Sequence, residues 1–241
     1  MIYLLAPEIV VITTGLLILI TDLCLPKRWS LNHPKGKYYL VYLGITGLSL
    51  AFVLCTQLFG VNLTIFKDML HIDSVAIFFK SVLLIAGLLI LLISADFFKG
   101  SEYEAEYYTL LLFSISGAMF MASANDFITV YLALELTSIP TYVLVGLQRK
   151  EPKSAEAAIK YALLGILGSV LIIYGISLLY GLTGTTNLAR ILSRLKSFPG
   201  ELLHGINLSA VVSMLFIGSG LSLKIAAAPF HFRAPDAYEG A

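Results

Sequence analysis

Three ionisable residues lie inside strongly apolar stretches of this chain, where side chains of that kind are uncommon. They are Glu135, Lys160 and Lys224. A charge near the centre of a bilayer costs roughly 3 kcal/mol on insertion scales, so residues of this kind are the first candidates for function. A carboxylate and amines inside one helical bundle can take up, hold and release protons. Proton handling is therefore the chemistry that these residue types predict.

Glu135 lies about ten residues from either end of its apolar segment, and its short side chain does not reach the interface. Tyr131, Ser138 and Tyr142 share its face if the segment is helical, which makes one polar stripe on an apolar helix. Pro140 removes a backbone hydrogen bond just beyond it and predicts a loosened or broken helix there. The alternative to function is a neutral carboxylic acid that is hydrogen-bonded to a neighbouring helix.

The two lysines allow more than one interpretation. Lys160 lies about one turn inside its segment and follows Glu156 by four residues, so a simple helix salt bridge and a functional lysine are both open. Lys224 would reach the interface if its helix ended at Pro229. If Pro229 instead interrupts a span that continues, Lys224 would lie at the break near mid-membrane, where free backbone groups line a polar pathway. His231 is either a structural histidine or a proton relay.

A glutamate and lysines in one bundle can couple proton transfer to conformation. Burial favours the neutral forms and pairing favours the charged forms, so separating Glu135 from a lysine would favour release of the lysine proton. The sequence contains no catalytic triad, phosphate loop or dinucleotide fingerprint. Cys24 and Cys55 lie far apart without CxxC spacing, which argues against a zinc or iron–sulfur site. The absence of a basic tract argues against nucleic-acid binding.

The elements that must position these residues are membrane-spanning helices. Of the 241 residues, 58% are hydrophobic and 13% are charged, against about 25% charged in soluble domains. The mean hydropathy of +0.88 exceeds what one globular core can bury, so much of the apolar surface must face lipid. Since about 20 apolar residues cross a bilayer as a helix, we expect seven spans, at about 4–22, 38–60, 74–98, 107–124, 126–147, 156–181 and 208–228. The predicted fold class is an all-α, polytopic membrane protein, with residues 1–241 in one domain.

The charges between the spans predict the orientation. The odd-numbered loops contain Lys27, Arg28, Lys35, Lys37, Lys99, Arg149, Lys150 and Lys153. The even-numbered loops contain Lys67, Arg190, Arg194 and Lys196, the last three in one long sixth loop. The positive-inside rule places the odd loops in the cytoplasm or its organellar equivalent, and the N-terminus on the opposite side. Glu102, Glu104 and Glu106 are expected in a solvated loop, and the first span is expected to be a retained anchor and not a signal peptide.

Three blocks of the chain, in order over about 125–240, are similar to a known family. YLALELTSIPTYVL at 131–144 resembles the glutamate-bearing fifth helix of the antiporter-like subunits of NADH–quinone oxidoreductase (complex I). SAEAAIKYALLG at 154–165, followed by 173–184, resembles the sixth helix and its exit. LSLKIAAAPFH at 221–231, followed by 234–240, resembles the broken seventh helix and the loop after it. Leu134 precedes the glutamate, where subunits L and M usually carry tryptophan, so the chain is most similar to subunit N (subunit 2 in organelles).

This resemblance implies a role for each candidate residue. Glu135 would be the glutamate that tunes the protonation of Lys224, the lysine of the seventh helix. Lys160 would be the sixth-helix lysine near the inlet half-channel. His231 and Pro229 would mark the helix break.

The resemblance also implies a translocase subunit that moves protons across the membrane, driven by quinone reduction elsewhere in its complex. Such a subunit holds no flavin, iron–sulfur cluster, metal or nucleotide. NADH and quinone would be used by the whole complex, with no quinone bound directly by this chain. Its partners would be the other membrane subunits and the lipid bilayer, but not nucleic acid. The expected location is the bacterial inner membrane, with an organellar inner or thylakoid membrane as the alternative.

The family fold contains inverted-topology repeats, and this chain resembles its N-terminal half. Residues 1–106 would hold the first three helices, and residues 107–241 an incomplete first repeat with helices four to seven. The chain would then stop in the loop before an eighth helix, as a fragment or a split form. Two other functions stay open: a subunit of a multi-subunit sodium/proton antiporter or of a membrane-bound hydrogenase, and a truncated structural scaffold without transport.

Overall fold

The computed structural model describes residues 2–24, 38–98, 101–196 and 208–240 of the chain. Within these ranges, six helices are long and apolar enough to cross a membrane. They are α1 (Ala6–Cys24, after the short 3-10 turn η1, Ile2–Leu5), α3 (Tyr38–Thr56), α4 (Ser74–Phe97), α5 (Glu104–Ala122), α6 (Phe127–Val145) and α7 (Pro152–Thr183). The remaining elements are β1 (Leu63–Ile65), β2 (Leu70–Ile72), α8 (Leu188–Lys196), α9 (Leu208–Lys224), the 3-10 turn η2 (Phe230–Phe232) and α10 (Arg233–Gly240). The first six predicted spans coincide with the six long helices, and the chain is a multi-pass membrane protein.

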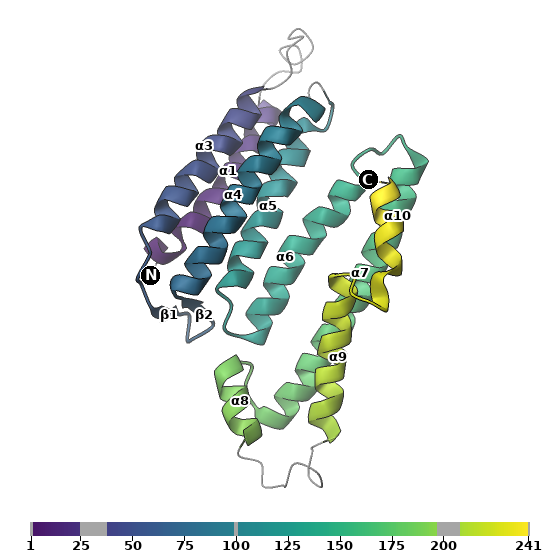
Figure 1. Ribbon diagram of the computed structural model, residues 1–241. Helices are drawn as coiled ribbons and strands as arrows, with labels where there is room; N and C mark the ends of the chain where they lie inside the picture. Colours follow the sequence, from purple (N-terminus) through teal and green to yellow (C-terminus); the bar gives the residue numbers. More distant parts are fainter. Residues whose placement is uncertain (1, 25–37, 99–100, 197–207, 241) are drawn as a thin grey trace.

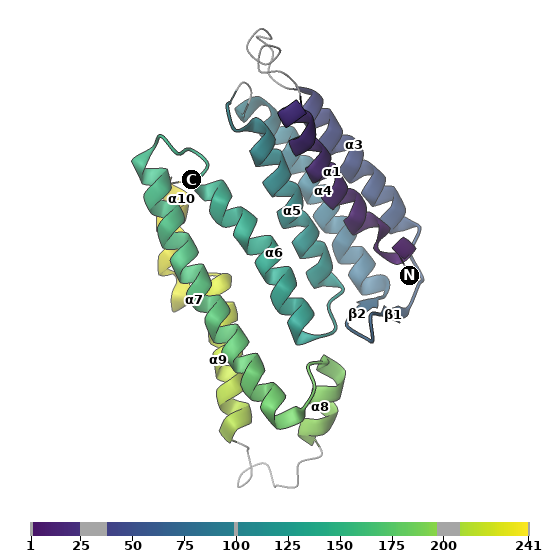
Figure 2. The ribbon, with the colours of Figure 1, turned by 180° about the vertical axis from the view of Figure 1, so that it is seen from behind.

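The helices run up and down the molecule in two groups (Figure 1). Helices α1, α3, α4 and α5 form a four-helix bundle, in which α1 and α4 each pack mainly on α3 and α5 and therefore face each other across a diagonal. Its core includes the fully buried Ile18, Leu84 and Leu112. Helix α6 packs on α5 and on α7, and α7 pairs with α9 around Ile172 and Ile217 (Figure 2). Glu135 and Lys224 thus belong to the second group.

The seventh predicted span is broken in the way that Pro229 suggested. Helix α9 ends at Lys224 after 17 residues, or about 26 Å, which is shorter than a bilayer core. Ala226, with φ at 52°, adopts the left-handed conformation that commonly ends helices. The chain then continues through η2 into α10, which lies along α7 beyond the end of α9 (Figure 1). Pro229 therefore interrupts a span that continues, which places Lys224 at a break and not at an interface.

Several expectations for individual segments were wrong. Residues 234–240 form α10 and not a loop, because they pack on the first turns of α7, where Gly240 lies against Lys153 and Ala157. Helix α6 runs without a break through Pro140 to Val145. There, the hydroxyl of Ser114 on α5 donates to the carbonyl of Thr137 at 3.2 Å and supports the backbone beside the proline. The helix therefore continues through the proline in place of the break that was expected.

The connections at the two membrane faces also differ from the prediction. The second loop contains the antiparallel hairpin β1–β2, and the sixth contains the amphipathic helix α8. Glu104 and Glu106 lie in the first turn of α5, where carboxylates suit the helix dipole, and Glu104 is buried instead of solvated. The basic residues of the first loop and Lys99 lie outside the described residues, so the orientation stays a prediction.

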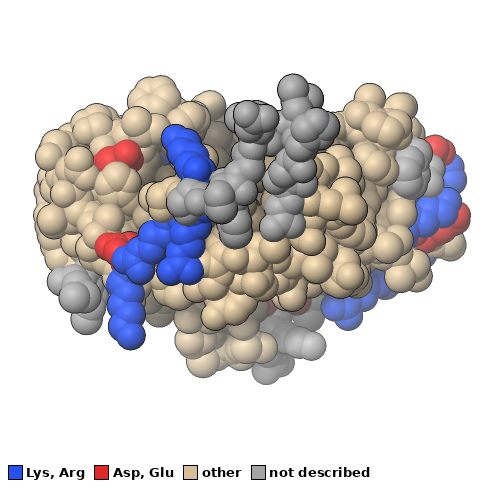
Figure 3. Space-filling model, turned by 90° about the horizontal axis from the view of Figure 1, so that it is seen from below, with Lys and Arg blue, Asp and Glu red and all other residues tan. Residues whose placement is uncertain are grey.

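The hairpin turn joins the two groups of helices at one face. Asp68 in this turn pairs with Arg190 of α8 at 2.8 Å, and its carbonyl accepts from the side-chain amide of Asn125 at 2.9 Å. Asn187, just before α8, donates to the same carbonyl at 3.2 Å. Figure 3 views this end and shows Lys and Arg side chains gathered on one part of it among mostly uncharged residues. These contacts fix the ends of α5, α6 and α7 relative to one another.

Glycines permit the close approach of α7 and α9. A Cβ on Gly220 would lie 2.5 Å from the carbonyl oxygen of Gly168, and a Cβ on Gly175 would lie 2.7 Å from that of Ser213. Small residues of this kind let helix backbones pack closely in membranes. Since Lys224 follows Gly220 by one turn, the close contact between α7 and α9 (the α7–α9 seam) sets the distance of Lys224 from α7.

We expect Gly220→Ala to lower the thermal stability of the chain in detergent by about 1–3 kcal/mol, because the added methyl overpacks the seam. Gly218→Ala is the matched control, since a Cβ there meets nothing within 4 Å, and the alanine favours helix. Equal melting temperatures for the two variants would contradict a tight α7–α9 seam.

Candidate functional site

The predicted candidates Glu135 and Lys224 meet directly. The Nζ atom of Lys224 lies 2.8 Å from Oε1 of Glu135, and the two side chains are only 4% and 20% exposed. Glu135 comes from α6, whereas Lys224 is the last residue of α9, 89 positions later. The contact agrees with the resemblance, which pairs Glu135 with the lysine of the seventh helix.

Hydroxyl groups complete the surroundings of this pair. Ser169 of α7 donates to Oε1 of Glu135 at 2.5 Å. The hydroxyl of Ser138 donates to the carbonyl of Leu134 at 2.6 Å, and its oxygen accepts from Lys224 at 3.4 Å. Buried charges persist where they are paired and hydrogen-bonded in this way. The site is therefore assembled by three helices: α6, α7 and α9.

The pair lies near the middle of the membrane-spanning length. Glu135 is eight residues from the start of α6 and ten from its end, or about 12 and 15 Å along the axis. A Cβ on Gly168 would lie 3.4 Å from Cγ of Lys224, and Gly168 is the seventeenth of the 32 residues of α7. The positions along α6 and along α7 therefore place the pair at the same depth. At this depth the side chains do not reach bulk water directly from either end of the helices.

The polar stripe predicted around Glu135 faces α7. Tyr142 packs edge-on against Tyr161 of α7, with ring centroids 4.9 Å apart, and its hydroxyl lies over Gly165. Tyr131 packs on the core formed by α7 and α9. The periodicity of α6 was therefore sufficient to identify the face that carries the site.

The backbone beside Lys224 leaves the regular helical pattern. The amide of Ala227 donates to the carbonyl of Ser222, five residues back, at 2.9 Å, and that of Ala226 donates to Leu223 at 3.4 Å. Lys224 lies at the C-terminal end of α9, where the helix dipole favours a cation. An irregular backbone at membrane depth typically lines a polar pathway or is enclosed by protein.

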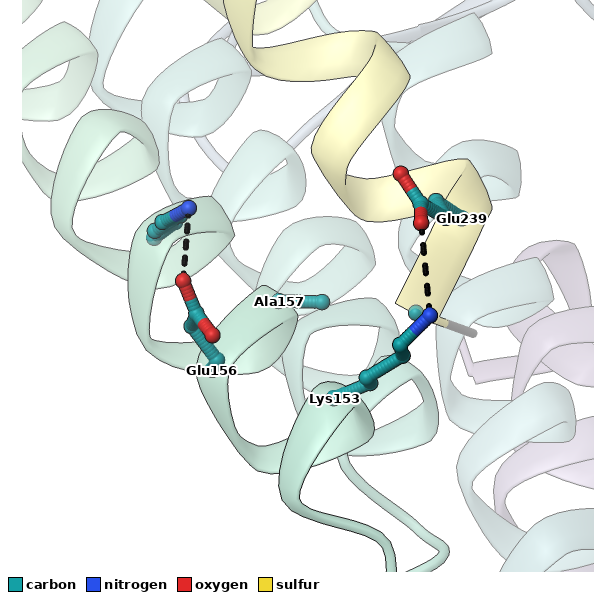
Figure 4. A pocket seen from close by; sticks show the side chains of 6 residues that line it. Lys153, Glu156, Ala157 and Glu239 are labelled. Carbon is teal, nitrogen blue, oxygen red and sulfur yellow. Dashed lines mark ion pairs between the residues drawn. The ribbon is translucent and has the colours of Figure 1, made fainter.

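Lys160 and His231 lie in more open surroundings. Lys160, two turns inside α7, pairs with Glu156 at 2.8 Å, and its side chain is 47% exposed. The salt bridge that was left open as an alternative is therefore present. Beside it, Lys153 pairs with Glu239 of α10 at 3.5 Å, and the two pairs border a pocket between α7 and α10 (Figure 4). His231 is exposed in η2.

A second buried ion pair was missed. The Nζ atom of Lys80 lies 2.5 Å from Oε1 of Glu8, and both side chains are almost fully buried. Lys80 is the seventh residue of α4, so the rule that singled out Glu135 would also have found it. Glu8 stands near the start of α1, where a sequence gives no sign of burial. In the described ranges, no group of three or more His, Cys, Asp or Glu side chains could hold a metal ion.

Comparison with known proteins gives a consistent picture. The family described as NADH:quinone oxidoreductase/Mrp antiporter, TM, matches residues 124–241. F(420)H(2) dehydrogenase subunit N of Methanosarcina mazei is 38% identical over 98% of this chain and 47% of its own length. NADH-quinone oxidoreductase subunit N of Trichlorobacter lovleyi is 38% identical over 98% of this chain and 46% of its length. The chain thus spans about half the length of the curated relatives it matches.

Solved structures show the same fold. A chain of respiratory complex I from Thermus thermophilus with bound aureothin matches 98% of this chain and 47% of its own length, with a TM-score of 0.74 and 25% identity. A chain of the membrane-bound sulfane sulfur reductase, an archaeal respiratory membrane complex, matches 99% and 47%, with a TM-score of 0.75 and 25% identity.

The buried pair makes a prediction for stability. We expect Glu135→Gln or Lys224→Met alone to destabilise the chain by about 3–5 kcal/mol, because each leaves one charge unpaired in the core. The double variant should recover most of this loss, a coupling that thermal unfolding of all four proteins in detergent would measure. Additive losses in the double variant would show that the two charges do not interact.

Proposed function

We propose that this chain translocates protons as a membrane subunit of a complex like NADH-quinone oxidoreductase. It is similar to subunit N of that complex over 98% of its own length, and residues 124–241 match the NADH:quinone oxidoreductase/Mrp antiporter transmembrane family. The observation that carries this proposal is the 2.8 Å contact between Glu135 and Lys224 at a helix break near mid-membrane. Ionisable residues at this depth commonly mark ion and proton pathways.

The geometry suggests how the pair transfers a proton. While Glu135 is in contact, its carboxylate stabilises the ammonium of Lys224. If Glu135 moves away, the ammonium loses its counter-charge in a medium of low dielectric constant and gives its proton to a neighbouring water or polar group. Return of the carboxylate favours uptake of a new proton. The break after Lys224 provides a short irregular segment that can absorb such a movement.

The other candidates would lie on the routes to this pair. We assign Lys160 to the proton route that starts at the pocket between α7 and α10. There an approaching charged group would compete with Glu156 for contact with Lys160. Pro229 would set the irregular segment, and His231 would serve the route beyond it. In this scheme residues 107–241 act as part of one antiporter-like repeat, and residues 1–106 act as a preceding helical unit.

The rest of the complex would supply the redox chemistry. We propose that the chain binds no flavin, iron–sulfur cluster or quinone itself, and that NADH and quinone react on partner subunits. Helix α6 supports the presence of membrane partners or lipid, because Leu132 and Ile139 on it are 60% and 55% exposed. Such apolar surface requires an apolar cover. The inner membrane of a bacterium is the proposed location.

Two related functions are each supported by an observation. The matching family includes Mrp antiporters, and one relative is a subunit of an F(420)H(2) dehydrogenase. The same pair would serve in an antiporter or in a complex with another electron donor. A scaffold without transport would need the pair only for stability.

We expect Glu135→Gln and Lys224→Ala each to reduce quinone-linked proton pumping to near background, because neither variant can form the pair. The measurement is acidification or alkalinisation driven by electron transfer, in membranes that contain the assembled complex. Glu102→Gln is the matched control, since this glutamate forms an ion pair with Lys150 in which both side chains are more than 70% exposed. Immunodetection of partner subunits would verify assembly.

Unchanged pumping in assembled complexes with either variant would reject the proposed role and favour a scaffold. Collapse of the signal by a sodium ionophore but not by a protonophore would identify sodium transport instead.

A further inference from the structure

The buried Glu8–Lys80 pair lies in the bundle that the proposed mechanism does not use. Helices α1 and α4 occupy a diagonal of the four-helix bundle, so a contact between them must cross its centre. The side chains are 0% and 1% exposed, and the N–O distance is 2.5 Å. Both side chains are therefore removed from water more completely than the side chains of Glu135 and Lys224. An ion pair here is not explained by stability, because apolar side chains of similar size commonly serve as well or better.

The pair lies close to one membrane face. Glu8 is the third residue of α1, and Lys80 the seventh of α4, so it is about one to two turns from the ends of these helices. Those ends lie beside the hairpin β1–β2 (Figures 1 and 2). Three hairpin side chains, Ile65, Leu70 and Ile72, are part of the bundle core. The hairpin is therefore the layer that separates the pair from the outside.

Neither carboxylate oxygen of Glu8 forms a hydrogen bond with a described residue: Oε1 contacts the Lys80 ammonium as an ion pair, and Oε2 has no such contact. Among the described residues, no donor forms a hydrogen bond with Oε2, although the atom is buried. Buried carboxylate oxygens normally accept hydrogen bonds, and each exception calls for an explanation. At Oε2 a proton can bind without displacing any existing contact. A buried ion pair offsets its desolvation cost only when further hydrogen bonds satisfy the remaining lone pairs.

The titratable groups around the pair are few. Helix α3 contributes Cys55, whose thiol contacts the carbonyl of Ile77 at 3.7 Å. The connection before α4 contributes His71 and Asp73, which lie 4.0 Å apart and are 39% and 33% exposed. In α5, the described acidic and tyrosine residues lie in its first two turns, at the opposite end of the bundle. His71 and Asp73 are therefore the groups that connect this region to the aqueous face.

We propose that Glu8 and Lys80 form a second proton-exchange site, which opens toward the face that carries the hairpin. A proton passes from Nζ of Lys80 to the carboxylate of Glu8, either of whose oxygens can carry it: an N–H bond breaks, an O–H bond forms, and both groups become neutral. The carboxylic acid then releases this proton to water at the hairpin face, and the amine takes up another from the same face. No further reactant is needed. Asp73 lies two turns before Lys80 on the same side of α4 and marks the route.

The test is infrared difference spectroscopy of the full chain in lipid vesicles, recorded between two pH values. We expect a carboxyl C=O band of about one group per chain that depends on pH, shifts in D₂O, and is lost in Glu8→Gln. The band should persist in Glu135→Gln, which separates this site from the pair used in the proposed function. A pH-dependent band that is unchanged in Glu8→Gln, or no such band at all, would overturn the proposal.

A second variant guards against misfolding. Glu8→Gln combined with Lys80→Met replaces the pair by neutral side chains of similar volume. We expect this double variant to keep the melting temperature of the parent while it lacks the carboxyl band. If the double variant melts like the parent and still shows the band, Glu8 does not exchange protons and the pair serves only to join α1 to α4.

Discussion

A charged side chain can remain at the centre of a membrane protein only if an opposite charge and hydrogen bonds replace the water that it has lost. In the second group of helices this constraint determines most of the structure around Glu135. The glycines of α7 and α9 remove the side chains that would hold the two backbones apart. Lys224 can then reach the carboxylate, and Ser169 completes its hydrogen bonding. Without the close seam, both charges would be stranded in an apolar medium.

The same constraint explains why the helix break matters. A regular helix through Lys224 would satisfy every backbone group and would hold the ammonium at a fixed position. The break at Ala226 instead gives the chain a short irregular segment next to the charge, while α9 and α10 remain anchored along α7 on either side. Charge separation in a low-dielectric medium is costly, so a small displacement there changes the energy of a proton on Lys224. In the proposed mechanism, this is how movement of the helices would be linked to proton transfer.

The molecule contains two buried pairs in two groups of helices, and polar contacts at the hairpin face join these groups. Asp68 connects the hairpin turn to Asn125 and to Arg190 of α8. Glu8 and Lys80 lie just beneath this layer, whereas Glu135 and Lys224 lie deeper, between α6, α7 and α9. Helix α6 also packs on α5 and on α7, so the two groups are joined along α6 as well as at the hairpin face.

The sequence by itself determined the spans and the chemistry. Hydrocarbon thickness requires long apolar helices, and charges inside such runs are rare enough to identify Glu135 and Lys224. Helical periodicity also predicted which face of α6 carries the site. The pairing of Glu135 with Lys224 came only from the family resemblance, and helical pattern by itself could not give it. The contact between α6 and α9 depends on glycines whose packing partners lie in other helices. For the same reason Glu8 near a helix start gave no sign of its burial. Pro140 predicted a break, whereas α6 continues through it. Only the tertiary structure decided these points, since distances between helices arise from side chains far apart along the chain.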